Sequence, residues 1–154
     1  MHWIIDGYNV LISNDLGHEE SSRGWFRDRI SACFSGKQVE VTIVYDSRGS
    51  IIIQRERVNS VVSEIYVDNA DQYIIDTIER SYHPRSIILV TEDREIIQTV
   101  RYRHPRCMNT ADFLSSLDSP PEPDHSPPEK PEFDTPENID RYMRLFNGEK
   151  GGMV

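Results

Sequence analysis

Short apolar runs recur along the chain, and those richest in β-branched residues stop at acidic side chains. Runs of this length and composition predict buried β-strands. We expect five such strands, at residues 2–5, 39–45, 61–67, 86–91 and 107–108. The intervening residues 51–58 mix apolar side chains with arginines, which indicates a loop or an irregular hairpin.

Apolar residues at helical spacing occupy most of the segments between these strands. The spacing predicts helices at residues 21–34, 68–82, 92–100 and 109–117. The second of these helices carries Ile74, Ile75, Ile78 and Tyr82 on one face. Because a strand, a helix and a strand in succession form a βαβ unit, we expect an α/β protein with a mostly parallel sheet.

Three of the predicted strands end on carboxylates. The first runs into Asp6, the second into Asp46 and the fourth into Glu92-Asp93. Because the carboxyl ends of parallel strands meet at one edge of a sheet, we expect these acids to lie together, with the amide of Asn9 nearby. Clustered carboxylates repel one another unless a cation lies among them, and hard oxygen ligands suit Mg²⁺ or Mn²⁺.

Several of these acids also have an ordinary structural interpretation. Asp6-Gly7 is a common turn dipeptide. Asp71 falls in the first turn of a predicted helix, where the helix dipole alone favours a carboxylate. Asp112 is either the capping residue of the last helix or a further acid of the edge, and we favour capping. The sequence leaves the first two alternatives open.

Charge is distributed unevenly along the 154 residues. The formal net charge is −9, but residues 116–154 hold nine acids and four bases, whereas residues 1–115 hold 17 acids and 13 bases. All but one of those 13 bases are arginines, which bind phosphate well. Arg48, Arg55 and Arg57 either reach phosphates near the acids or form a solvated face. The composition predicts weak non-specific binding to RNA without excluding an RNA substrate.

The sequence shows no sign of export or membrane insertion. The N-terminal apolar stretch is too short for a signal peptide, and no run approaches the ~20 apolar residues of a membrane span. Cys33 and Cys107 form no CxxC pair, so we interpret them as free buried thiols. We therefore expect a soluble cytoplasmic protein without a membrane partner.

The composition changes sharply after the last predicted helix of the main domain, which we place at residues 1–117. Prolines, acids and serines dominate residues 118–135, which predicts an extended Pro-rich acidic linker. Residues 136–148 then predict a short amphipathic helix that begins at a proline. Because so short a helix is marginal alone, we expect it to dock on its own domain or on a partner, either a protein or a ribonucleoprotein assembly.

Four motifs, taken in order, resemble the YacP-like NYN branch of the PIN-type nucleases. They are Ile4-Ile5-Asp6-Gly7-Tyr8-Asn9-Val10, Val44-Tyr45-Asp46, Ala70-Asp71 and Val90-Thr91-Glu92-Asp93-Arg94. The resemblance covers roughly residues 1–117. It implies a PIN-like three-layer fold with a mostly parallel central sheet, helices on both faces, and a metal-dependent nuclease that acts mainly on RNA.

The resemblance also implies roles for individual side chains. The residues that match the main acidic positions, and that would hold Mg²⁺ or Mn²⁺, are Asp6, Asp71 and Asp93. Asn9 and Asp46 would position water or outer ligands of the metal, and Arg94 would contact the phosphate or hold a carboxylate. The chain departs from the family at Gln72, where an acid usually follows the helix-start Asp, and at Glu92, which replaces a small residue and is a candidate extra ligand.

Two functions follow from these observations. The first is a metal-dependent endoribonuclease, in which hydroxide from water attacks the phosphate and leaves a 3′-hydroxyl and a 5′-phosphate. The alternative is a catalytically weak or inactive NYN-fold module that binds RNA or a ribonucleoprotein, and Gln72 favours it. An aspartyl-phosphate enzyme is a weaker interpretation, because such enzymes usually place a second Asp where this chain has Tyr8.

Overall fold

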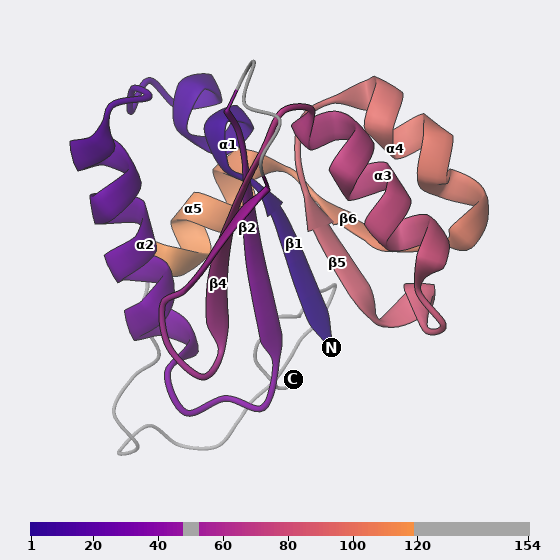
Figure 1. Ribbon diagram of the computed structural model, residues 1–154, viewed down its shortest axis with the longest axis horizontal. Helices are drawn as coiled ribbons and strands as arrows, with labels where there is room; N and C mark the ends of the chain where they lie inside the picture. Colours follow the sequence, from indigo (N-terminus) through magenta and orange to yellow (C-terminus); the bar gives the residue numbers. More distant parts are fainter. Residues whose placement is uncertain (48–52, 119–154) are drawn as a thin grey trace. The chain divides into compact units, whose positions relative to one another are not determined.

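The computed structural model describes residues 1–47 and 53–118, which fold into strands and helices (Figure 1). The strands are β1 (His2–Asp6), β2 (Glu40–Asp46), β3 (Gln54–Arg57), β4 (Val62–Val67), β5 (Ile87–Val90) and β6 (Arg106–Met108). The α-helices are α1 (Gly7–Ser13), α2 (Glu20–Phe34), α3 (Ala70–Arg80), α4 (Arg94–Val100) and α5 (Thr110–Asp118). Two 3₁₀ turns, η1 (Pro84–Ser86) and η2 (Arg101–Arg103), complete the described elements.

The strands form one sheet in the order β3-β4-β2-β1-β5-β6. All neighbouring strands pair in parallel except β3, a four-residue edge strand that runs antiparallel to β4. This confirms the predicted α/β class, and β3 with β4 supplies the irregular hairpin expected around residues 51–58. Because the central strands are parallel, their carboxyl ends share one edge of the sheet.

Helices cover both faces of this sheet, which gives the predicted three layers (Figure 1). Successive side chains of a strand point to opposite faces, and β1 is buried on both, as expected for a central parallel strand. On the first face, Trp3 packs with Phe113 and with side chains of α1 and α2. On the second face, Ile4 packs with Ile74 and with other side chains of α3 and α4.

The structure corrects three details of the sequence analysis. Helix α1 was not predicted, because it holds only seven residues directly after a strand; it buries Val10 and Leu11. Tyr82 is 93% exposed rather than on the apolar face of its helix, because α3 ends at Arg80 and the chain turns extended. Cys107 is a free thiol but is exposed rather than buried.

Some sequence predictions fall outside the described residues. These are the interpretation of Arg48, the Pro-rich linker from residue 119 onward, and the helix predicted at residues 136–148. The domain boundaries therefore stay predictions. In residues 1–47 and 53–118, no helix combines the length and apolar character that crossing a bilayer requires.

Candidate active site

Four acidic residues come to the carboxyl edge of the sheet, and together they are called the acidic edge below. Asp6 and Asp46 are the last residues of β1 and β2, which pair directly. Asp71 lies in the first turn of α3, and Asp93 precedes α4, directly beyond the end of β5. The acidic edge therefore joins two strand ends and two helix starts, and the electrostatic effects of its members on one another show that they lie close together.

Asp6 is the buried member of the acidic edge. Its side chain is only 7% exposed, and burial, reinforced by the charges of Asp71 and Asp93, raises its pKa to about 7. A hydrogen bond from the hydroxyl of Thr91 to Asp6 Oδ2, 3.1 Å long, acts in the opposite direction and favours the charged form. A nearby cation would stabilise the charged form of this buried carboxylate.

Asp71 is exposed at the start of α3, yet its pKa is also raised. The main cause is partial loss of hydration, followed by the charges of Asp93 and Asp46. A helix dipole acting alone would lower the pKa of a first-turn carboxylate. The effects of Asp93 and Asp46 on this pKa place Asp71 near both of them, at the acidic edge.

Asp93 has a structural task as well. Its Oδ1 caps α4 by accepting hydrogen bonds from the backbone N–H groups of Glu95 and Ile96, at 2.9 and 3.3 Å. Its own N–H donates to Thr91 Oγ1 at 3.0 Å. Thr91 thus connects Asp6 to Asp93, which fixes the relative positions of β1 and the start of α4. The sequence analysis missed Thr91 as a site residue, although it belongs to the quoted Val90-Thr91-Glu92-Asp93-Arg94 motif.

Asn9 is the third residue of α1, in its first turn, and its side chain reaches the residues that follow β5. Its Oδ1 accepts a hydrogen bond from the backbone N–H of Glu92 at 2.6 Å, and Thr91 Oγ1 lies 3.4 Å from the same oxygen. The Asn9 side chain therefore holds the loop between β5 and α4 beside Asp6. We interpret Asn9 as a positioning residue on this evidence.

Glu92, the candidate extra ligand, uses one of its carboxylate oxygens as a structural acceptor. Its Oε2 accepts hydrogen bonds from both the backbone N–H and the hydroxyl of Thr110, each 2.8 Å long. Thr110 is the first residue of α5, so Glu92 anchors that helix. Asp112 likewise belongs to the cap of α5. Its N–H donates to Asn109 Oδ1 and its Oδ2 accepts a hydrogen bond from Asn109 Nδ2, which confirms a capping role.

The acidic edge fits a divalent cation in donor chemistry and charge. Carboxylate oxygens suit Mg²⁺ and Mn²⁺, and burial, followed by the charges of neighbouring acids, raises the pKa values of Asp6 and Asp71, an effect that a bound cation would oppose. In the described residues, however, no three His, Cys, Asp or Glu side chains are arranged to hold an ion together. The edge gathers the donors without forming a closed coordination shell.

The arginines predicted to bind substrate are placed differently from one another. Arg55 and Arg57 lie on the exposed edge strand β3, where Arg55 donates to the hydroxyl of Tyr73 at 3.4 Å and Arg57 to Ser63 Oγ at 3.2 Å. Arg94 is exposed at the first position of α4, directly after Asp93. Gln72, where the family resemblance implies an acid, is exposed and donates to Asp76 Oδ1 at 2.9 Å.

A mostly parallel sheet between two helical layers, with acids at the carboxyl ends of its strands, defines a PIN-like nuclease-type domain. The model of the YacP-like NYN domain family matches residues 3–143, and the chain belongs to this family.

Solved structures agree with this assignment at the level of the fold. Rae1 (YacP) from Bacillus subtilis superposes with a TM-score of 0.59 at 16% sequence identity, over 77% of this chain and 74% of that one. Its W164L mutant gives a TM-score of 0.60 at 17% identity, over 77% and 75% of the two chains. No curated protein sequence matches this chain significantly.

Proposed function

We propose that this protein is a metal-dependent endoribonuclease whose site is the acidic edge. The observation that carries the proposal is the buried Asp6, which is bonded to Thr91 and shares its surroundings with the charges of Asp71 and Asp93. At neutral pH the domain gains nothing in stability from this placement of Asp6 and Asp71, because burial and the charges of neighbouring acids disfavour the charged forms of both side chains. Membership of a nuclease-type family supports the same function.

The side chains of this site divide into ligands and supports. Asp6, Asp71 and Asp93 would hold Mg²⁺ or Mn²⁺, which supplies charge stabilisation for the phosphate and lowers the pKa of a bound water. Thr91 keeps Asp6 Oδ2 in place, and Asn9 fixes the adjoining loop. Asp46 would orient water, and Arg94, Arg55 and Arg57 would contact phosphates of the substrate. Because Asp6 loses its proton near pH 7, its ability to bind a cation rises through neutral pH.

The test is cleavage of a pool of structured and single-stranded RNAs in Mn²⁺, with EDTA as the metal-free control. Asp6→Asn and Asp93→Asn should each reduce cleavage by at least about 100-fold, since each removes a charge that would hold the ion. Asp28→Asn is the matched control, because Asp28 lies on α2 with its side chain 82% exposed. Wild-type activity in all three variants would refute the proposed site.

Two observations favour a second function, an RNA-binding module without efficient catalysis. Gln72 replaces a family acid, and the described residues show no closed metal shell. This reading predicts RNA binding that persists in EDTA, with no cleavage at any Mn²⁺ concentration. Replacement of Gln72 by Glu would then create or raise cleavage, whereas an already competent nuclease would change little.

We infer a cytoplasmic location and a protein or ribonucleoprotein partner from the sequence. Free Cys33 and Cys107 fit a reducing, cytoplasmic environment. We infer that residues 136–148 contact a protein or ribonucleoprotein partner that presents the RNA, because an acidic protein has little general affinity for RNA. A chain that ends at Asp118 should keep its folding stability but lose association with that partner in a pull-down from cytoplasmic extract.

A further inference from the structure

The same six-residue pattern, Arg-x-x-His-Pro-Arg, occurs twice in the second half of the domain. It spans residues 80–85 and 101–106, and each copy leads from a helix into a strand. The first copy connects α3 to β5 through η1, and the second connects α4 to β6 through η2. Figure 1 shows α3 and α4 next to each other beside β5. Because β5 and β6 are parallel neighbours, the two copies lie at the amino ends of adjacent strands.

Two hydrogen bonds join the second copy to the first. The hydroxyl of Tyr102 donates to Glu79 Oε1 at 2.6 Å, and Arg103 donates to the backbone oxygen of Ser81 at 2.6 Å. His104 has a left-handed backbone with φ 63°, a conformation that persists in a non-glycine residue only where the surroundings fix it. The two turns therefore form one surface of fixed shape, called the arginine patch below. Besides Tyr102, its exposed members are Tyr82, His83, Arg85, Arg101, His104 and Arg106.

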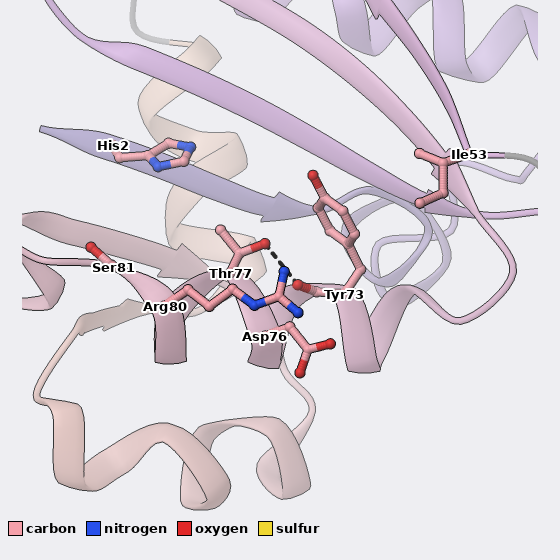
Figure 2. A pocket seen from close by; sticks show the side chains of 7 residues that line it. All are labelled: His2, Ile53, Tyr73, Asp76, Thr77, Arg80 and Ser81. Atoms are coloured by element: carbon pink, nitrogen blue, oxygen red, sulfur yellow. Dashed lines mark hydrogen bonds between the residues drawn. The ribbon is translucent and has the colours of Figure 1, made fainter.

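The arginine patch carries surplus positive charge in a chain whose formal net charge is −9. In residues 1–47 and 53–118, no carboxylate oxygen lies within 4.0 Å of the guanidinium of Arg85, Arg101 or Arg106. Arg80 differs from these three, because it lies one turn of α3 from Asp76, as Figure 2 shows. The surplus charge of the patch therefore comes from the three arginines named first.

The arginine patch and the acidic edge lie at opposite ends of the sheet. Arg106 begins β6 and pairs with Ile88 of β5, whereas Asp93 lies beyond the carboxyl end of β5. At about 3.3 Å per residue, the four residues of β5 alone separate the two ends by roughly 13 Å. A ligand that binds the patch therefore leaves the acidic edge uncovered.

The exposed side chains of the patch are of the types that protein interfaces favour. Tyrosine and arginine are enriched at the centres of such interfaces, and Tyr82 is 93% exposed. The guanidinium of arginine binds a carboxylate through two parallel hydrogen bonds. Arginines beside exposed tyrosine rings therefore suit a ligand that combines Asp or Glu side chains with an apolar or aromatic one.

The small extent of the patch favours a protein ligand over a nucleic acid. A nucleic acid carries a negative charge on every phosphate. Most of such a strand would extend past the patch over a domain in which residues 1–115 hold 17 acids and 13 bases. A short acidic segment of a protein ends within the patch and avoids that repulsion.

We propose that the arginine patch binds a short acidic segment of a partner protein. Carboxylates of this segment pair with Arg85, Arg101 and Arg106, and an apolar or aromatic side chain packs on Tyr82. Because the two turns are already joined to each other, little of the surface has to be ordered on binding. This contact is distinct from the one proposed for residues 136–148, and it does not depend on the nuclease function, since the patch contains no residue of the acidic edge.

The experiment measures binding to the full chain by fluorescence anisotropy. The probe is a fluorescein-labelled peptide of about ten residues, built from Asp and Glu around a central Phe, at low ionic strength so that charge pairs are little screened. A peptide with Asn and Gln in place of the acids is the matched probe. We expect a Kd on the order of 10–100 μM for the acidic peptide and binding at least about tenfold weaker for the neutral one.

The double variant Arg85→Gln/Arg106→Gln should raise the Kd of the acidic peptide about tenfold or more, because it removes two exposed guanidiniums that pair with carboxylates. Tyr82→Ala should raise it about threefold through loss of ring contact. Arg57→Gln is the matched control, because it removes a charge from β3, at the opposite edge of the sheet from β6. Its Kd should stay within about twofold of wild type. Circular dichroism melting confirms that each variant is folded.

Three results would overturn the proposal. They are equal binding of the acidic and neutral peptides, equal losses in the double variant and in Arg57→Gln, and no binding of the acidic peptide at about 1 mM. An RNA that binds more tightly than the peptide in EDTA, and loses this binding in the double variant, would assign the patch to nucleic acid and overturn it too.

The result is separable from that of the proposed function. The double variant should keep the Mn²⁺-dependent cleavage of the wild type, because its changes lie at the far end of the sheet from the acidic edge. Loss of peptide binding in the double variant supports the patch whether or not the wild type cleaves RNA. Peptide binding like that of the wild type would refute the patch and leave the nuclease proposal unaffected.

Discussion

The hydroxyl of Thr91 lies 3.1 Å from Asp6 Oδ2, and this hydrogen bond joins the residue after β5 to the last residue of β1. The same hydroxyl oxygen accepts the N–H of Asp93 at 3.0 Å. One small side chain therefore orients two of the three proposed metal ligands. Because it is 2% exposed, water cannot readily replace it.

Thr91→Val tests this relationship. Valine keeps the shape but removes the hydrogen bond, so Asp6 loses the contact that favours its charged form and its pKa rises further. We expect Mn²⁺-dependent cleavage to fall by about 10- to 100-fold, the usual cost of losing a residue that supports metal ligands. Thr99→Val is the control, since Thr99 is an exposed α4 residue bonded only to Glu95 O. Similar cleavage by both variants would show that Thr91 acts only through stability.

The folding stability should depend on pH through Asp6. Its pKa is raised from 3.8 to about 7 by folding, so the folded state retains a proton that the unfolded chain has already lost. The contribution of protonated Asp6 to the free energy of unfolding is complete below pH 4 and is lost as the pH rises through 7. It amounts to about 4 kcal/mol at most. Urea unfolding at pH 4 to 8 should therefore show that the free energy of unfolding of Asp6→Asn increases relative to that of the wild type as the pH rises. Parallel pH curves for the two proteins would contradict the assignment.

Glu92 should matter for stability rather than for catalysis. Glu92→Ala leaves the N–H of the buried Thr110 without its acceptor, and we expect a loss of about 1–3 kcal/mol in the free energy of unfolding. Cleavage measured well below the melting temperature should stay within about threefold of wild type. Glu20→Ala, at an exposed first helical residue of α2, should change stability by less than about 0.5 kcal/mol. A selective loss of cleavage would instead make Glu92 a ligand.

Gly7 should be required by close packing at the start of α1. A Cβ there would lie 2.7 Å from Tyr45 Cδ1 and 2.9 Å from Tyr45 Cζ, in a fully buried ring. We expect Gly7→Ala to destabilise the fold by about 1–3 kcal/mol, because the ring cannot move without disturbing the core. Gly24→Ala offers the opposite case within α2, where the added Cβ meets only the flexible end of Arg27. It should stabilise the protein by about 0.5–1 kcal/mol, and thermal melting compares the two.

The order of strands and helices was predictable because a buried face produces a regular spacing of apolar residues along the sequence. The strand before Asp6 and the one before Asp46 are buried on both faces, so they read as continuous apolar runs. Helix α1 could not be predicted in this way, since seven residues are too few to establish a helical period. The predicted end of α3 was wrong. Tyr82 continues the apolar spacing, but the helix ends at Arg80 and the backbone is extended at Ser81.

The acidic edge was partly predictable in the same way. Parallel strands carry their terminal residues to a common edge, so Asp6 and Asp46 could be paired without coordinates. Asp71 was ambiguous, because a first-turn acid has a sufficient local explanation. Only the structure shows that Asp93 and Asp46 lie close enough to Asp71 to raise its pKa further, in addition to the effect of its loss of hydration.

The sequence by itself determined the α/β class, the family resemblance and the gathering of acids, because periodicity and strand direction depend only on local order along the chain. Tertiary structure alone decided which acids face one another and which serve as caps. Glu92 and Thr110 are 18 residues apart, and Thr91 and Asp6 are 85 apart. Such pairings depend on how the layers of the fold pack against one another, and no local pattern in the sequence encodes that packing.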